Sequence, residues 1–153
     1  MQKITTFLMF NNQTEKAVNL YVSVFKNSKI VSLNRMGGGE NGAVVSATFE
    51  LEGQTFYAFD GGSYFSFSNG ISLFVSCETQ QEVDALWEKL SEGGEKLQCG
   101  WLKDKFGVSW QIIPTALSKL MQDKDPEKSK RVMQAMMQMK KIIIEDLQKA
   151  YDG

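Results

Sequence analysis

The sequence predicts an α+β fold in which two βαβββ modules form a curved mixed sheet with a cleft, followed by a C-terminal helical extension. Three observations support this prediction. The first sixty residues read as a strand, a helix and three strands; the same order begins again after a linker rich in Ser and Phe; and beyond Pro114 only helical spacing remains. We therefore expect one domain over residues 1–114, with modules over about 1–62 and 63–114. Helices over 115–153 are expected to pack on that domain or on a dimer mate.

The first module is expected to open with a strand from Ile4 to Phe10, a segment rich in Thr, Phe and Ile. Thr14 is the expected N-cap of the following helix, because apolar residues recur after it at helical spacing: Ala17, Val18, Tyr21, Val22 and Phe25. Three further strands complete the module, over residues 29–36, 44–51 and 55–60. The glycine-rich segment 37–42 joins two of these strands, which favours a hairpin over a phosphate loop, since phosphate loops lead from a strand into a helix.

The second module repeats this order, with a strand from Ile71 to Cys77 and a helix after it. Thr79 and Glu82 have the spacing of a capping box, and Gly93-Gly94 is expected to end the helix. Strands are then expected over residues 96–103 and 108–113, around a turn that Asp104 shapes.

The extension begins where Pro114 stops the sheet. A short helix is expected near residues 117–121, and a second helix has Asp125 as its N-cap and Pro126 in its first turn. That helix has a methionine-rich face, formed by Val132, Met133, Met136, Met137 and Met139. Such a face is either an adaptable binding surface or part of a core or subunit contact.

Composition excludes several classes of site. The 153 residues contain no histidine, so Ser-His-Asp and Cys-His relays and histidine-ligated zinc or iron sites are excluded. The net charge of −1 argues against nucleic-acid binding, and no apolar run is long enough to span a membrane. Met1 to Phe10 does not read as a signal peptide, and two cysteines are too few for a disulfide framework. We therefore expect a cytoplasmic protein.

The run from Cys99 to Pro114 resembles the signature of PhnB-like proteins. These form a branch of the glyoxalase/bleomycin resistance/dioxygenase (vicinal oxygen chelate) superfamily, and their domain is often labelled 3-demethylubiquinone-9 3-methyltransferase. Three further segments are similar to this branch: residues 15–25, residues 82–87 and residues 136–144. The resemblance implies a glyoxalase-like domain of paired modules over residues 1–114, and a homodimer.

Enzymes of this superfamily usually hold a divalent metal through His, Glu or Gln on the first and last strands of each module. The resemblance places Thr6, Ser72 and Gln111 at three of these positions, and the fourth falls near Ala58. One amide oxygen cannot hold a metal ion that requires three or four strong donors. We therefore expect no metal and no other cofactor.

The candidate ligand-binding residues each have an alternative structural role. Gln111 either hydrogen-bonds a ligand in the cleft or satisfies buried backbone groups, and it must face away from Trp110, its neighbour on the strand. Trp101, Trp110 and Phe59 are either walls of a ligand site or core residues. The full candidate set is Thr6, Phe59, Ser72, Cys99, Trp101, Trp110 and Gln111.

Two residues are candidates for chemistry. Asp60, at a strand end beside Gly61-Gly62, is the candidate catalytic acid or base, and a solvated turn residue is the alternative. Cys99 is a nucleophile or a small buried apolar residue; no histidine or neighbouring cation is available to activate it. The leading hypothesis is a metal-free protein that binds an unknown apolar or aromatic small molecule. The alternative is an enzyme: a methyltransferase acting on a quinone-like phenol, although no S-adenosylmethionine motif is visible, or a cofactor-free isomerase or lyase.

Overall fold

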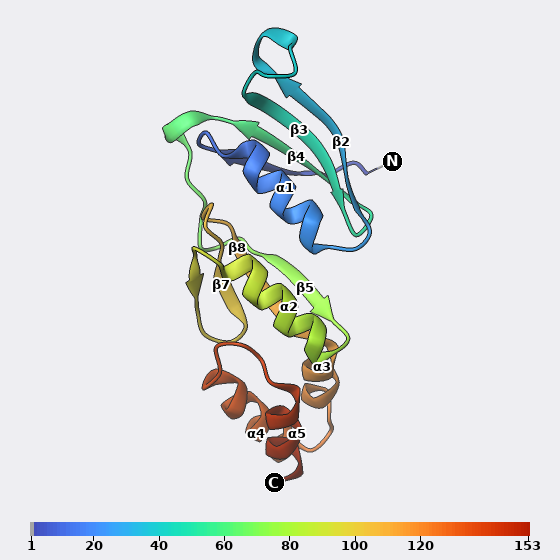
Figure 1. Cartoon of the computed structure of the whole chain (residues 1–153). Helices are drawn as coiled ribbons and strands as arrows, with labels where there is room; N and C mark the ends of the chain where they lie inside the picture. The colour runs from blue at the N-terminus through green and yellow to red at the C-terminus, as the bar shows by residue number, and fades with distance from the viewer. Residues whose placement is uncertain (1) are drawn as a thin grey trace. The chain divides into compact units, whose positions relative to one another are not determined.

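A computed structural model describes residues 2–153, and the chain divides after Phe67 into two units, the second being Ser68–Gly153 (Figure 1). Each unit contains a four-stranded mixed sheet with a helix on one face. The order of elements confirms the two predicted βαβββ modules and the C-terminal helical extension. The predicted cleft stays a prediction, as do the module boundaries.

The first unit has the strand order β1-β4-β3-β2, in which β1 and β4 are parallel and the other neighbours antiparallel. Helix α1 packs on one face, where Ala17, Val18 and Tyr21 are fully buried. The aromatic side chains of Phe49 and Phe56 stack below it, with ring centroids 5.4 Å apart. The elements are β1 (Thr6–Phe10), α1 (Thr14–Val24), β2 (Ser28–Arg35), the short helix η1 (Met36–Gly38), β3 (Val44–Leu51), β4 (Gln54–Asp60) and η2 (Gly62–Tyr64).

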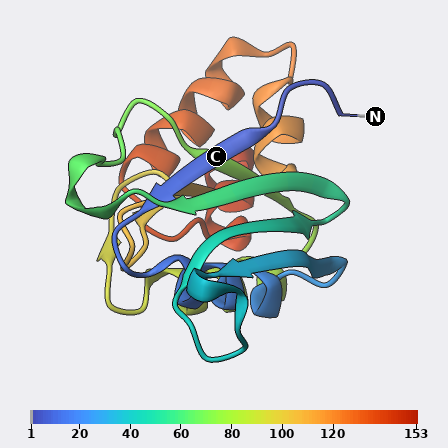
Figure 2. The ribbon, with the colours of Figure 1, turned by 90° about the horizontal axis from the view of Figure 1, so that it is seen from above.

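The predicted N-cap of α1 is wrong by one residue. Ala17 N donates to Gln13 O at 2.9 Å, so the helical ladder begins at Gln13 and Thr14 already lies in the first turn. Thr14 Oγ1 is buried and has no hydrogen-bond partner among the described residues. The glycine-rich segment joins β2 to β3 as a loop beyond the strands (Figure 2), closed by a bond from Met36 N to Ala43 O. The hairpin interpretation of this segment is confirmed.

The second unit has the strand order β5-β8-β7-β6, with β5 and β8 parallel. Helix α2 covers one face through Val83, Leu86, Trp87 and Leu90, and its predicted cap is confirmed because Glu82 N donates to Thr79 Oγ1 at 3.1 Å. The elements are β5 (Leu73–Cys77), α2 (Gln80–Ser91), β6 (Glu95–Lys96), β7 (Trp101–Lys103) and β8 (Ser109–Pro114).

The single strand predicted over residues 96–103 is wrong. The segment forms two short antiparallel strands, β6 and β7, with a turn between them. Cys99 (φ 61°) and Gly100 (φ 80°) adopt left-handed backbone conformations, which are incompatible with a continuous strand. A side chain at Gly100 would lie 2.7 Å from Ile113 Cδ1, so the turn also depends on the absence of a Cβ there.

The extension forms three helices, α3 (Thr115–Met121), α4 (Pro126–Met137) and α5 (Ile144–Asp152). They pack around a core of Ile113, Leu117, Val132, Ile142 and Leu147. The predicted cap of α4 is confirmed, since Glu127 N donates to Asp125 Oδ1 at 2.9 Å. The methionine-rich face divides: Met136 and Met139 pack against this core, whereas Met133 and Met137 are exposed.

Candidate functional site

The second unit presents a row of three side chains on the face of its sheet opposite α2. Phe74 of β5 lies opposite Gln111 of β8, which in turn lies opposite Trp101 of β7. Directly opposed residues project to the same side of a sheet. Their sequence neighbours Leu102, Trp110 and Ile112 are buried, whereas Phe74 is 56% exposed and Gln111 and Trp101 are half-buried. We call Phe74, Gln111, Trp101 and Ser72 the amide face.

Gln111 and Ser72 are brought together from segments 39 residues apart, because Gln111 Nε2 donates to Ser72 Oγ at 2.9 Å. Gln111 therefore hydrogen-bonds a side chain. This differs from the expected alternative in which it satisfies buried backbone groups. Gln111 Oε1 and the Ser72 hydroxyl hydrogen have no protein partner within residues 2–153. The pair therefore offers one acceptor and one donor to a hydroxyl, phenol or carbonyl group.

Trp110 lies on the opposite face, and its place among the ligand-binding candidates is corrected. Its side chain is 2% exposed, and its Nε1 donates to Asp104 Oδ2 at 2.9 Å. It is therefore a core residue of the sheet, which is the alternative role given for it above, and it does not form a wall of a ligand site. Trp101 remains on the open face as a candidate wall.

Asp104 has the turn-forming role expected from the sequence. Its Oδ1 accepts hydrogen bonds from Phe106 N at 2.9 Å and Val108 N at 3.0 Å. The carboxylate is buried and ties the turn before β8 to the indole of Trp110. This bond network fixes the start of the strand that carries Gln111.

In the first unit, Phe59 lies on the open face of the sheet but Thr6 does not. Thr6 pairs directly with Phe56, which is buried on the side of α1, so the two ligand-binding candidates Thr6 and Phe59 lie on opposite faces of the sheet. The apolar side chains of Phe7, Met9 and Tyr57 accompany Phe59 on the open face. Phe7 and Tyr57 form an edge-to-face pair with ring centroids 6.1 Å apart.

Sequence reasoning did not find Phe7, Tyr57 and Phe74. A signal for them exists, because each alternates along its strand with residues that are less exposed. The alternation identifies two faces, but it does not tell which face a helix covers.

The two residues considered for chemistry, Asp60 and Cys99, make structural contacts within residues 2–153. Asp60 Oδ1 accepts from Gly62 N at 3.2 Å, which is the turn role expected as its alternative. Cys99 is half-buried, and its backbone N–H is bound to Met139 O. The other cysteine, Cys77, is fully buried, and this burial raises its pKa to about 12, so its thiol is unreactive at neutral pH.

The residues that the superfamily would use for a metal do not fit one. Thr6 lies on the α1 side of its sheet, and Ser72 and Gln111 are hydrogen-bonded to each other. Across residues 2–153, no group of three or more His, Cys, Asp or Glu side chains is placed to hold a metal ion. Neutral amide and hydroxyl groups without a carboxylate or imidazole are a weak donor set for a divalent ion.

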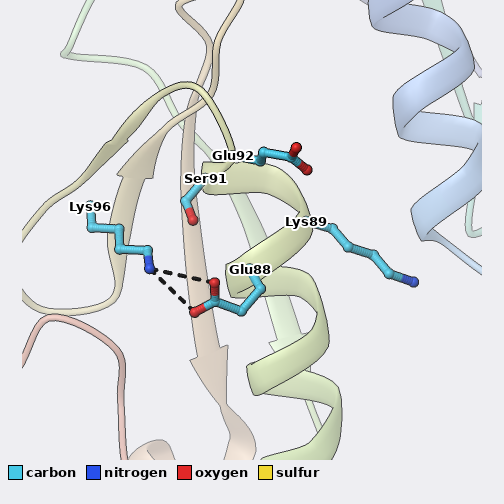
Figure 3. A pocket seen from close by; sticks show the side chains of 5 residues that line it. All are labelled: Glu88, Lys89, Ser91, Glu92 and Lys96. Carbon is cyan, nitrogen blue, oxygen red and sulfur yellow. Dashed lines mark hydrogen bonds and ion pairs between the residues drawn. The ribbon is translucent and has the colours of Figure 1, made fainter.

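A depression of about 360 Å³ lies at the C-terminal end of α2, and it differs from the amide face in chemistry (Figure 3). Its lining is polar: Glu88, Lys89, Ser91, Glu92 and Lys96. Lys96 Nζ lies 3.3 Å from Glu88 Oε1 in an exposed ion pair. With no aromatic side chain in its wall, this depression does not suit an apolar ligand.

The two modules define a glyoxalase-like protein, and membership of this fold family supports a small-molecule-binding role. The chain belongs to the family described as 3-demethylubiquinone-9 3-methyltransferase, whose model matches residues 2–113, and within its superfamily to the PhnB-like proteins.

Two solved structures illustrate the similarity. The PhnB protein from Bacillus cereus is 44% identical with a TM-score of 0.68, and the match covers 74% of this chain and 99% of that one. Protein PA1353 from Pseudomonas aeruginosa shares the fold at 20% identity, with a TM-score of 0.64 over 74% of this chain and 98% of its own. No curated protein matches the chain. No helix within the described residues has the length and apolar character needed to cross a bilayer.

Proposed function

We propose that this protein binds an apolar or aromatic small molecule on the amide face, without a metal ion. The observation that carries the proposal is the row Phe74–Gln111–Trp101, in which two aromatic side chains flank a carboxamide that Ser72 holds in place. Aromatic rings supply contact area and stacking, and one fixed polar pair orients the ligand. This is the usual composition of a small-molecule site.

The polar pair favours a ligand that carries a hydroxyl or carbonyl group next to its ring. Gln111 Oε1 can accept from a phenol, and the Ser72 hydroxyl can donate to an adjacent oxygen. The bond between the two side chains fixes the direction of the amide before a ligand arrives, which lowers the entropic cost of binding.

The test is a thermal-shift screen of aromatic compounds, followed by titration of the hits. We expect Gln111→Leu and Trp101→Ala each to weaken binding of a hit about tenfold, the effect of losing about 1.4 kcal/mol. Val31→Ser, on an exposed position of β2, is the matched control and should leave the affinity unchanged. Hits that bind both amide-face variants as tightly as the unaltered protein would show that the ligand lies elsewhere.

The family description supports a second candidate, a methyl transfer to a quinone-like phenol. The connection from β1 to α1 runs through Asn11, Asn12 and Gln13 and contains no glycine, so it lacks the turn that common S-adenosylmethionine enzymes use. Calorimetric titration with S-adenosylmethionine separates the two proposals: heat that saturates with one site per chain would favour the enzyme. Elemental analysis of protein purified without chelator tests the metal-free part, which stoichiometric metal would contradict.

A further inference from the structure

The segment that joins α4 to α5 holds the turn between β6 and β7. Cys99 N donates to Met139 O and Gly100 N donates to Lys140 O, both at 2.8 Å. These bonds link residues about forty positions apart, and they run from backbone to backbone. The turn is therefore fixed by the C-terminal extension as well as by its own strands.

The left-handed backbone conformation of this turn is unfavourable in isolation, so the turn requires stabilising contacts from outside its own strands. Cys99 is a non-glycine residue with φ 61°, a conformation that L-residues with a Cβ seldom adopt without support. Gly100 lies against Ile142 and Ile113, so that the space a Cβ would need is already occupied. The extension thus both bonds and packs against the turn.

Gln80, at the start of α2, forms hydrogen bonds to the segment that joins α4 to α5. Its Nε2 donates to Ile142 O at 3.0 Å, and its Oε1 accepts from Ile144 N at 2.8 Å, so the amide pairs with the segment as a backbone peptide would. Gln80 Nε2 also donates to Asp84, whose carboxylate lies 3.0 Å from Lys141 Nζ. The hydrogen bond from Gln80 and the contact with Lys141 lower the pKa of Asp84.

The turn leads directly into the amide face. Trp101 follows Gly100 in the chain, and Gly100 O accepts from Ile112 N, next to Gln111, at 2.8 Å. We infer that Gln80 and residues 139–144 are positioning elements, which hold Trp101 at its place beside Gln111 and thereby set the affinity of that face. The ligand part of this inference rests on the proposed function. The extension that carries it lies beyond the family match, which ends at residue 113.

The test compares Gln80→Met with Gln81→Met. Methionine keeps the length and helix propensity of glutamine but removes the hydrogen bonds, and Gln81 is an exposed neighbour on the same helix turn. The protein contains three tryptophans, so 5-fluorotryptophan labelling gives three ¹⁹F signals, and Trp101→Phe assigns one of them. Hydrogen exchange at the Cys99 and Gly100 amides is measured on the same samples.

In Gln80→Met we expect the Trp101 signal to shift, those of Trp87 and Trp110 to stay, and exchange at both turn amides to rise at least tenfold. Ligand binding should weaken three- to tenfold, whereas Gln81→Met changes nothing. An unchanged Trp101 signal with unchanged exchange in folded Gln80→Met would overturn the inference. If Gln80→Met does not fold, Lys141→Met is judged by the same criteria.

The two proposals fail in different ways. The signal and exchange measurements need no ligand, so they test the positioning role even if no aromatic compound binds. Loss of positioning with no effect of Gln111→Leu on any hit would leave the positioning role standing and reject the amide face as the site.

Discussion

At the scale of single residues, Asp104 is the side chain on which the candidate face most depends. Its two carboxylate oxygens accept hydrogen bonds from the N–H groups of Phe106, Val108 and the indole of Trp110. A carboxylate is suited to this arrangement, because it accepts at every position and donates at none. Since the group is 2% exposed, water cannot replace a lost partner.

Asp104→Asn is expected to destabilise the protein by about 1–3 kcal/mol, because the amide must turn its NH₂ toward one of these buried donors. Urea unfolding followed by far-ultraviolet circular dichroism measures the loss. Asp146→Asn, at an exposed position of α5, serves as the control and should stay within about 0.5 kcal/mol of the unaltered protein. Equal stabilities of the two variants would contradict the role given to Asp104.

At the scale of elements, the C-terminal helices are joined by polar contacts as well as by their core. Tyr151 OH donates to Asp123 Oδ2 at 2.5 Å, which links the end of α5 to the segment after α3. Arg131 of α4 donates to the backbone oxygens of Ala150 and Tyr151, at 2.9 and 2.8 Å, and so satisfies acceptors at the end of α5. These contacts hold the three helices in register.

The Tyr151–Asp123 bond predicts a pH dependence with two limits. The bond to Tyr151 lowers the pKa of Asp123, so its stabilising effect is present above the ordinary aspartate pKa near 4 and is lost as the pH falls through the lowered value. Asp123 raises the pKa of Tyr151, so that contribution is present below the ordinary tyrosine pKa near 10 and is lost as the pH rises through the raised value.

We therefore expect Tyr151→Phe to lower the thermal midpoint at pH 7 and to flatten its fall at both pH limits. Thermal unfolding from pH 3 to 11 measures this. Tyr64→Phe, at a highly exposed tyrosine, is the control and should keep the full pH profile. A Tyr151→Phe profile parallel to that of the unaltered protein would contradict the assignment.

At the scale of the whole molecule, the order of elements could be predicted and the residues of the face only in part. Hydrophobic periodicity and capping motifs act over a few residues, so the strands, helices and the caps at Thr79 and Asp125 were predictable. The turn at Cys99 was not, because its left-handed backbone is stabilised by residues about forty positions away.

Which residues form the amide face also depends on contacts between distant segments, so it could be predicted only in part. Alternation placed Gln111 and Trp110 on opposite faces, as observed, but the burial of Trp110 depends on where α2 and Asp104 lie. Ser72 and Gln111 were named by resemblance, and their hydrogen bond depends on the long-range pairing of β5 with β8. Thr6 was also named by resemblance, and the side of the sheet on which it lies depends on the pairing of β1 with β4.

The last expectation concerns assembly, and we predict a homodimer in solution. The first unit exposes aromatic residues on the open face of its sheet, among them Phe7 and Tyr57, and exposed apolar faces commonly mark interaction surfaces. The extension is a weaker candidate for the contact, since Val132, Ile142 and Leu147 are fully buried within their own unit. Only Met133 and Met137 of its methionine-rich face remain exposed.

Sedimentation equilibrium should therefore give twice the mass of one chain, both for the unaltered protein and for the double variant Met133→Glu/Met137→Glu. The glutamates place charge on the exposed side of α4 and leave its buried side intact, so the fold is kept. A monomeric double variant would show instead that the methionine-rich face is the dimer contact. A monomeric unaltered protein at micromolar concentration would reject the dimer itself, because a permanent interface is saturated in that range.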